Sequence, residues 1–392
     1  MAEINQRRVE QQLRNFERAL QAYGHDEPLS RFLTRFFKEN RQMGSADRRM
    51  TSRYCYNYFR LGEAVKAISL QEKLVIAEFL CEQASDLVAL HQPDWLAAIT
   101  APLAEKIAFL QDQGIAVKDA IFPFQQHLSP DVRTEDFVLN HLIQPDLFIR
   151  VQQQATEQVE AELQRAAISF SSIGKAGYRL PNGSKLQELK GIAGLYEVQD
   201  QSSQQSLDMA QLQPGQSWWD ACAASGGKSL LLLEKESAVR LLVSDIRLSI
   251  LRNLDERFQV AKVKAAYRKK VLDLTEDVDH IMQGERFDGI ILDAPCSGSG
   301  TWSRTPEMIK QFSEAKIAEF SDLQKRIAKQ VSAYLKPKGQ LIYITCSVFQ
   351  EENEAVVAFL EASCGLKVET QQLIAGYNRK SDSMFAARLR KI

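Results

Sequence analysis

Two cysteines occupy positions at which a thiol could act as a nucleophile. Cys296 lies in "DAPCSGSGTW", directly after the apolar run "GIIL", and Cys346 lies in "YITCS", at the end of another apolar run. Side chains that follow neighbouring parallel strands lie roughly 5 Å apart, and the thiolate is the reactive form of cysteine. We therefore predict that the two thiols, fifty positions apart in the chain, face one substrate.

A loop of small residues, "DACAASGGKS" at 220–229, predicts a ligand site close to these thiols. A P-loop would need glycine where Cys222 stands, and the G-x-G-x-x-G pattern of dinucleotide sites is absent. Asp245 ends the next apolar run, where its carboxylate would accept hydrogen bonds from both ribose hydroxyls and would repel a triphosphate. These features favour S-adenosylmethionine, with Asp273 or Asp277 accepting a hydrogen bond from the adenine amino group.

The elements that must position these residues alternate apolar runs with helical patterns. The runs "SWWDACAA", "RLLVSD", "FDGIILDAP" and "GQLIYITCS" predict parallel strands joined by crossover helices. This is a doubly wound, Rossmann-like α/β domain, and we assign it to residues 202–392. Because ligands bind beyond the carboxyl ends of such strands, we expect Asp220, Asp245, Asp293 and Cys346 to converge on one cleft.

Two further domains are predicted before it. Residues 1–143 repeat apolar side chains at spacings of three and four without strand-like runs, which indicates an all-helical domain. Residues 144–201 mix short strands, turns and a helix, and indicate a small α/β module. The low-complexity stretch "QSSQQS" marks its boundary with the third domain.

A basic stretch lies within the helical domain. Residues 31–60 hold eight Arg or Lys against two acids, with seven aromatic residues between them. Guanidinium groups for phosphates and rings for bases would suit RNA, whereas a bundle with a ring-filled core and a solvated basic face predicts the same pattern. We predict that Arg48, Arg49 and Arg53 contact RNA phosphates, and we also assign Arg304 to substrate binding.

Composition excludes several classes of protein. The 392 residues are 45% hydrophobic and 25% charged with a net charge of −1, which is typical of a globular protein. No apolar run has the length of a signal peptide or a membrane span, so we expect a cytoplasmic protein. The six cysteines form no C-x-x-C pair, so we expect free thiols and no metal site. We also expect a monomer.

A thiol beside S-adenosylmethionine and an acid suits the methylation of cytosine at carbon 5. That carbon is a poor nucleophile until a thiolate adds to carbon 6 and breaks the ring's aromaticity. A carboxylic acid at ring nitrogen 3 stabilises the charge that develops, and a base must finally remove the carbon 5 proton. The base must be unstacked, which points to unpaired or remodelled nucleic acid.

The sequence resembles the Sun/Nop (Fmu/RsmB-type) RNA cytosine-5 methyltransferases from about Gln144 to its end. The resemblance lies in "QPDLFIRV", "LYEVQDQSSQ", "DACAASGGKS", "LLVSD", "DAPCSGSGTWSRTPE", "YITCSVFQEENE" and "MFAARLRK". It implies that residues 144–201 form an RNA-recognition-like module. More loosely, residues 4–142 are similar to the helical antitermination factor NusB.

The resemblance also implies roles for single residues. The nucleophile would be Cys346, and Cys296 would help to release the product. Asp293 would contact both the cofactor and the base. The other cofactor residues would be Cys222, Ala223, Ala224, Ser225, Gly226, Gly227, Lys228, Asp245 and Asp273. DNA cytosine methyltransferases, which are similar in chemistry, attack instead with the cysteine of their Pro-Cys motif, so the two families assign opposite roles to Cys296.

Two departures and several alternatives accompany this resemblance. Ser225 stands where the family usually has proline, which would stiffen the loop, and Thr305 stands where asparagine is common. Ribosomal RNA of the small subunit is the favoured substrate, with transfer RNA as an alternative. A catalytically silent RNA-binding protein for ribosome assembly and a nucleotide hydrolase with a degenerate P-loop are the rival hypotheses. A Cys-His hydrolase is disfavoured because His280 is the only histidine in residues 202–392.

Overall fold

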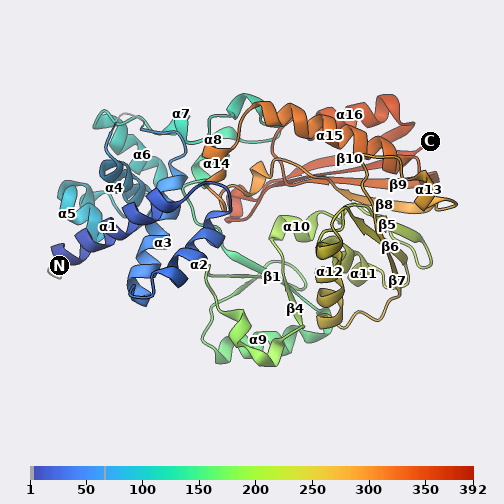
Figure 1. Cartoon of the computed structure of the whole chain (residues 1–392), viewed down its shortest axis with the longest axis horizontal. Helices are drawn as coiled ribbons and strands as arrows, with labels where there is room; N and C mark the ends of the chain where they lie inside the picture. The colour runs from blue at the N-terminus through green and yellow to red at the C-terminus, as the bar shows by residue number, and fades with distance from the viewer. Residues whose placement is uncertain (1–3, 66–67) are drawn as a thin grey trace. The chain divides into compact units, whose positions relative to one another are not determined.

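The computed structural model describes residues 4–65 and 68–392 and divides into two compact units (Figure 1). The helical unit comprises the described residues up to 126, together with 133–144 and 302–313. The sheet unit comprises residues 127–132, 145–301 and 314–392.

This division differs from the three predicted domains. Residues 302–313 join the helical unit because Trp302 and Phe312 pack their rings on Phe122 and Phe124. Residues 127–132 join the sheet unit through backbone hydrogen bonds to residues 348–350. The sequence carries no local pattern that assigns either segment to its unit, because each assignment depends on contacts with residues far away in the chain.

The helical unit is built from short amphipathic helices, and its described residues contain no strand. Side-chain caps begin α1 at Asn5 and α4 at Ser69, where Glu72 completes a capping box. The helices are α1 (Gln6–Ala22), α2 (Leu29–Glu39), α3 (Ser45–Arg60), α4 (Leu70–Cys81), α5 (Asp86–His91), α6 (Leu103–Asp112), α7 (Lys118–Ile121), α8 (Thr134–Asn140) and α14 (Met308–Gln311), with the 3-10 turns η1 (Pro93–Ala97) and η2 (Gln125–His127).

The sheet unit opens with a small module over residues 145–201. Its four strands pair antiparallel in the order β2-β3-β1-β4, and Ile149, Val159, Leu163 and Tyr178 fill its core. The elements are β1 (Leu147–Val151), η3 (Gln153–Ala155), α9 (Thr156–Arg165), β2 (Ser171–Ser172), β3 (Gly177–Leu180), η4 (Leu186–Glu188), η5 (Lys190–Ile192) and β4 (Tyr196–Val198).

A seven-stranded sheet with the order β10-β11-β9-β8-β5-β6-β7 follows. Its strands are β5 (Ser217–Asp220), β6 (Arg240–Asp245), β7 (Tyr267–Val271), β8 (Phe287–Asp293), β9 (Leu335–Thr345), β10 (Leu366–Ile374) and β11 (Met384–Lys391). Strands β5 to β9 are parallel, which confirms the predicted doubly wound α/β fold. Beyond β9 the sheet continues with β11, which runs antiparallel to β9, and with β10, which pairs antiparallel with β11; neither strand was predicted.

Helices cover both faces of this sheet (Figure 1). Helices α15 (Ala315–Ser332) and α16 (Glu354–Ser363) pack on one face, and α11 (Gly227–Lys235) and α12 (Leu248–Val260) pack on the other. The short elements α10 (Gln201–Gln205), α13 (Asp279–Met282), η6 (Ser299–Thr301) and η7 (Tyr377–Arg379) complete the unit. The strand order reverses at β5, with β6 on one side and β8 on the other, and a ligand cleft is expected beyond the carboxyl ends of strands at such a point.

Candidate active site

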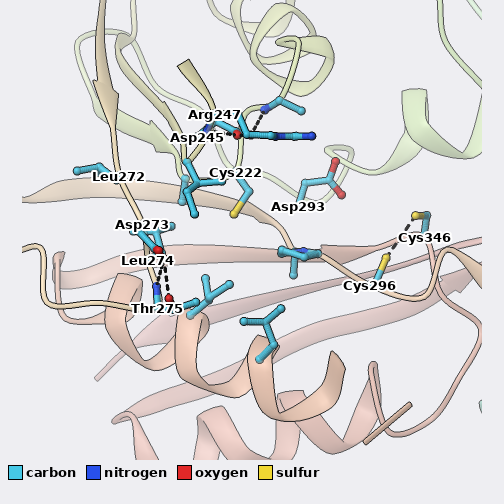
Figure 2. Close-up of a pocket in the computed structure, with 17 residues that line it drawn as sticks. Cys222, Asp245, Arg247, Leu272, Asp273, Leu274, Thr275, Asp293, Cys296 and Cys346 are labelled. Carbon is cyan, nitrogen blue, oxygen red and sulfur yellow. Dashed lines mark hydrogen bonds and ion pairs between the residues drawn. The ribbon is translucent and has the colours of Figure 1, made fainter. Parts of the chain in front are cut away.

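A cavity of about 570 Å³ opens beyond the carboxyl ends of β5, β6, β8 and β9 (Figure 2). Its size is typical of a small-molecule site. Apolar side chains from several elements form much of its wall. The lining residues are Ala221, Cys222, Ala224, Asp245, Ile246, Arg247, Leu272, Asp273, Leu274, Thr275, Asp293, Ala294, Pro295, Cys296, Leu323, Ile327 and Cys346. We call this space the first cavity.

The loop of small residues turns sharply before α11. Gly226 has φ +83°, and a Cβ there would come within 3.0 Å of Leu254 and Phe258, so only glycine fits. Ala224 also has positive φ, and its N–H donates to Asp245 at 3.2 Å. The turn therefore brings the loop backbone against the carboxylate that ends β6.

Asp245 is held with its carboxylate at the cavity wall. The backbone N–H of Arg247 donates to Oδ1 at 2.9 Å and its Nε donates to the same oxygen at 3.2 Å (Figure 2). The residue is 7% exposed, yet it lines the cavity. A carboxylate in this place fits a pair of ribose hydroxyls, as expected for an adenosine-type cofactor.

Asp273 and Asp277, which the sequence left as alternatives, lie in different cavities. Asp273 lines the first cavity, and the N–H and Oγ1 of Thr275 donate to it at 2.9 and 2.6 Å. These hydrogen bonds, with Oγ1 the stronger influence, lower the pKa of Asp273. Asp277 lines a separate cavity and accepts from Asp279 N. The geometry therefore favours Asp273 as the adenine partner.

Asp220 does not face the cleft, contrary to the expectation for the four strand ends. Its carboxylate is fully buried beneath the loop and accepts a hydrogen bond from Ser229 Oγ at 2.6 Å. Burial raises its pKa to about 7, opposed by the Ser229 hydrogen bond and reinforced by the charge of Asp293. Strand β5 ends at Asp220 as expected, but the carboxylate is hydrogen-bonded to Ser229 on the first turn of α11, and Ala221 and Cys222 line the cavity instead.

Cys296 and Cys346 lie side by side beyond β8 and β9, with their sulfur atoms 3.3 Å apart (Figure 2). The hydrogen bond between them, together with burial, raises the pKa of Cys296 well above its ordinary value. Cys296 is therefore held as a neutral thiol next to Cys346. All six cysteines of the chain are free.

A buried polar network, which the sequence analysis did not anticipate, supports the two cysteine loops. Glu352 is fully buried and accepts hydrogen bonds from Ser297 N at 2.9 Å, Ser347 Oγ at 2.7 Å and Gln324 Nε2 at 2.8 Å. Ser297 directly follows Cys296 and Ser347 directly follows Cys346. One carboxyl group thus ties both loops together, and its only trace in the sequence was the family motif "EENE".

Residues 127–132 brace the loop that follows Cys346. Ser129 N donates to Val348 O at 2.8 Å, and Gln350 N donates to His127 O at 2.8 Å. The Ser129 hydroxyl also donates to Glu354 at 2.9 Å. This segment was assigned to the helical domain, whereas its contacts place it in the sheet unit.

A second cavity of about 350 Å³ meets the first at Ala224, Asp293 and Cys346. Lys228, predicted as a cofactor residue, lines this second cavity and donates to Asp293 at 3.1 Å and to Ser203 Oγ at 3.0 Å. The remaining lining residues are Val198, Gln199, Asp200, Ser203, Ala223, Ser225, Gly227, Arg257, Thr301, Asp382 and Met384. Gly226 lines neither cavity and shapes the turn instead.

The four arginines assigned to substrate binding lie outside both cavities, in the helical unit. Arg53 is engaged within the fold, because its guanidinium donates to Glu78 and to Ala84 O. Arg48 donates to two carbonyl groups and Arg49 is exposed. Arg304 is half-buried within the segment 302–313.

Four of the seven rings of the basic stretch form core rather than a surface for bases. Phe32, Phe36, Tyr54 and Phe59 are buried. Arg60 is buried as well, and it donates to the backbone carbonyls of His141, Ile143 and Ser303. For these four rings the bundle interpretation of the sequence is the correct one. Arg53 is paired with Glu78 and Arg60 is buried, so neither belongs to the solvated basic face which that interpretation predicts.

Two absences concern the described residues alone. Within 4–65 and 68–392 no cluster of three or more His, Cys, Asp and Glu side chains could hold a metal ion. In the same ranges no helix combines the length and the apolar character needed to cross a bilayer.

Comparison with known proteins points to one family. Residues 208–390 match the family model described as 16S rRNA methyltransferase RsmB/F. Ribosomal RNA small subunit methyltransferase B of Shewanella oneidensis is 34% identical over 180 residues, which cover 46% of this chain and 41% of the relative. Its counterpart in Proteus mirabilis is 31% identical over 253 residues, which cover 63% of this chain and 59% of the relative. The chain thus spans about half the length of the curated relatives that it matches.

Solved structures show the same fold. The crystal structure of PH0851 aligns with a TM-score of 0.72 and 20% identity, covering 97% of this chain and 98% of the other. NSun6 from Pyrococcus horikoshii, solved with SFG, aligns with a TM-score of 0.61 and 17% identity, covering 69% and 97%. The family model over residues 208–390 and the curated relatives confirm the resemblance noted in the sequence, and the solved structures confirm the fold.

Proposed function

We propose that this chain, whose residues 208–390 are similar to the RsmB/F methyltransferases, methylates carbon 5 of cytosine in small-subunit ribosomal RNA. The observation that carries the proposal is the position of Cys346 and Asp293. Both line the first and the second cavity, and Cys346 lies 3.3 Å from the neutral thiol of Cys296. The cytosine to be methylated would lie in the second cavity, next to both side chains. The reaction would take place in the cytoplasm.

The first cavity fits S-adenosylmethionine as the cofactor. Asp245 would accept hydrogen bonds from the ribose hydroxyls, and Asp273 would accept one from the adenine amino group. Leu272, Leu274 and Pro295 offer an apolar wall for the adenine ring. The bound cofactor would supply a methyl group on a positively charged sulfur.

Cys346 would form the bond to carbon 6 of cytosine, and this bond makes carbon 5 nucleophilic. Asp293, in its carboxylic acid form, would donate a hydrogen bond to ring nitrogen 3 and so stabilise the negative charge that develops there when the sulfur–carbon 6 bond forms. Lys228, 3.1 Å from Asp293, would hold that carboxyl group in place. After methyl transfer a base removes the carbon 5 proton, the sulfur–carbon 6 bond breaks, and Cys296 can protonate the departing sulfur.

The lining of the two cavities supports this assignment over the reverse one. Cys346 lines both the first and the second cavity, whereas Cys296 lines only the first. The assignment used by DNA cytosine methyltransferases would require the base to reach Cys296 instead.

The test combines methyl transfer with detection of a covalent adduct. The chain is incubated with S-adenosylmethionine carrying a labelled methyl group and with transcripts of small-subunit ribosomal RNA or transfer RNA. We expect Cys346→Ala to lower the transfer rate by about 10³-fold or more and to leave no denaturant-resistant adduct. Cys296→Ala should instead accumulate that adduct. Cys364→Ala, which removes a buried thiol outside both cavities, is the matched control.

Each contrary result has a defined meaning. An adduct that survives Cys346→Ala and is lost in Cys296→Ala would reverse the roles of the thiols. Methylation of transfer RNA alone would overturn the ribosomal substrate. Binding of RNA without any methyl transfer would leave the catalytically silent RNA-binding protein as the better description.

We also propose that Arg48 and Arg49 contact RNA phosphates. On α3, Arg49 is exposed and Arg48 is half-buried, so RNA can reach both residues. Such contacts supply affinity that falls with salt concentration. Arg53 is left out of this proposal because Glu78 already holds its guanidinium.

A further inference from the structure

One helix of the sheet unit reaches from the cofactor site to the small module. Helix α12 begins directly after Arg247, whose N–H donates to Asp245 in the first cavity. At its other end, Ala261 O accepts a hydrogen bond from Gln152 of the small module at 3.1 Å. A Cβ on Gly194 of the module would come within 2.4 Å of Val260 O, so the two backbones lie in close contact.

Arg257, near the end of this helix, joins the module to the cofactor loop. Its Nε donates to Glu197 on β4 at 2.7 Å, and its Nη1 donates to Ser225 Oγ at 3.1 Å. Glu197 and Arg257 are 13% and 24% exposed as side chains, so water screens the pair only in part. The guanidinium also lies over Gly227, at 3.5 Å from where a Cβ would be.

The loop that Arg257 contacts is one whose conformation matters for the cofactor. Ser225 lies between Ala224 and Gly226, the two residues of the loop that adopt positive φ. A hydrogen bond to its hydroxyl restrains the loop at the point where the chain turns. A planar guanidinium can hold Glu197 and Ser225 at once, whereas a lysine ammonium is a point charge that lacks this fork.

We propose that Arg257 is a positioning residue that couples the small module to the cofactor loop, so that RNA held by the module strengthens cofactor binding. The inference rests on the proposed function, because its RNA ligand is the one whose base would lie in the second cavity, which Val198 and Gln199 at the end of the small module also line. Coupling between two ligands is reciprocal, so the cofactor must strengthen RNA binding by the same factor.

Binding of S-adenosylhomocysteine to the full chain, measured by calorimetry without turnover, tests the first half of the proposal. We expect Arg257→Met to weaken this binding about fivefold to tenfold, and Arg257→Lys to recover part of the loss. Glu197→Gln and Ser225→Ala should each weaken it about twofold to threefold while Arg257 is present. In the Arg257→Met background the same two changes should have no further effect. Arg252→Met, an exposed arginine on the same helix, is the control.

Repeating the titration with a saturating transcript of small-subunit ribosomal RNA tests the second half. The wild-type chain should bind S-adenosylhomocysteine about fivefold more tightly with RNA, and Arg257→Met should lose this gain. Thermal unfolding of each variant shows whether the fold is intact. If Arg257→Met is unfolded, the S-adenosylhomocysteine affinity of Arg257→Lys with and without RNA is compared with that of the wild-type chain instead.

Three results would overturn the inference. The first is unchanged S-adenosylhomocysteine binding in both Arg257 variants, and the second is effects of Glu197→Gln and Ser225→Ala that add fully to the effect of Arg257→Met. The third is an equal gain in S-adenosylhomocysteine affinity from RNA in the wild-type chain and in Arg257→Met. A wild-type chain that binds no S-adenosylhomocysteine would instead contradict the proposed function.

Discussion

The two sides of the active site are held by different kinds of contact. On the cofactor side, most hydrogen bonds to Asp245 and Asp273 come from residues only two positions further along the chain, and Ala224 N adds one to Asp245. On the thiol side, the loops of Cys296 and Cys346 meet at Glu352, which is 55 positions from Ser297 and fully buried. Local turns survive the loss of one side chain better than a buried network does. Substitutions on the cofactor side should therefore change affinity, and those on the thiol side should change both stability and rate.

The largest expected effect is that of Glu352→Ala. It leaves three buried donors without their acceptor, and each unpaired donor costs about 1–3 kcal/mol, so the free energy of unfolding should fall by at least about 3 kcal/mol. At a temperature where the variant remains folded, methyl transfer should be slowed while S-adenosylhomocysteine binding stays within about twofold of wild type. Urea denaturation and calorimetry measure the two effects.

Glu361→Ala is the matched control, because this exposed glutamate accepts only a surface hydrogen bond from Val368 N among the contacts described for it. Its free energy of unfolding should change by about 0.5 kcal/mol or less. If Glu352→Ala instead weakened cofactor binding as strongly as it slowed transfer, the two sides would not be separable.

The same difference explains how much could be predicted from the sequence. Local sequence patterns predict the small-residue loop and the position of Asp245. The alternation of strand and helix patterns predicts the parallel sheet. All three could therefore be recognised from the sequence. Glu352 could not be found this way, because its partners come from three separate segments. The pairing of Arg53 with Glu78, 25 positions away, could not be predicted for a related reason.

Asp220 is an exception on the cofactor side, since it is fully buried beneath the loop. Burial raises its pKa from 3.8 to about 7, so the folded chain holds this proton more tightly than the unfolded chain does. The stability from this proton is complete below about pH 4 and is lost as the pH rises through about 7. Asp220→Asn cannot ionise, so its free energy of unfolding relative to wild type should rise by about 2–4 kcal/mol between pH 4.5 and 8.

Urea denaturation of both proteins at a series of pH values isolates this single group, because the other titrating groups cancel in the difference. A difference that stays constant across the range would show that Asp220 is ionised in the folded chain at acidic pH. It would then resemble Asp273 in its electrostatics rather than the buried carboxyl group of Glu352.

The smallest expected effect separates Asp273 from Asp277. If Asp273 accepts a hydrogen bond from the adenine amino group, Asp273→Ala should weaken S-adenosylhomocysteine binding about fivefold, the equivalent of about 1 kcal/mol for one hydrogen bond. Asp277→Ala should leave it unchanged, because Asp277 lines a separate cavity. S-inosylhomocysteine carries an oxygen in place of the amino group, so Asp273→Ala should not weaken its binding. Equal losses for both ligands would mean that Asp273 acts only by shaping its turn with Thr275, and the cofactor side would then depend on its turns alone.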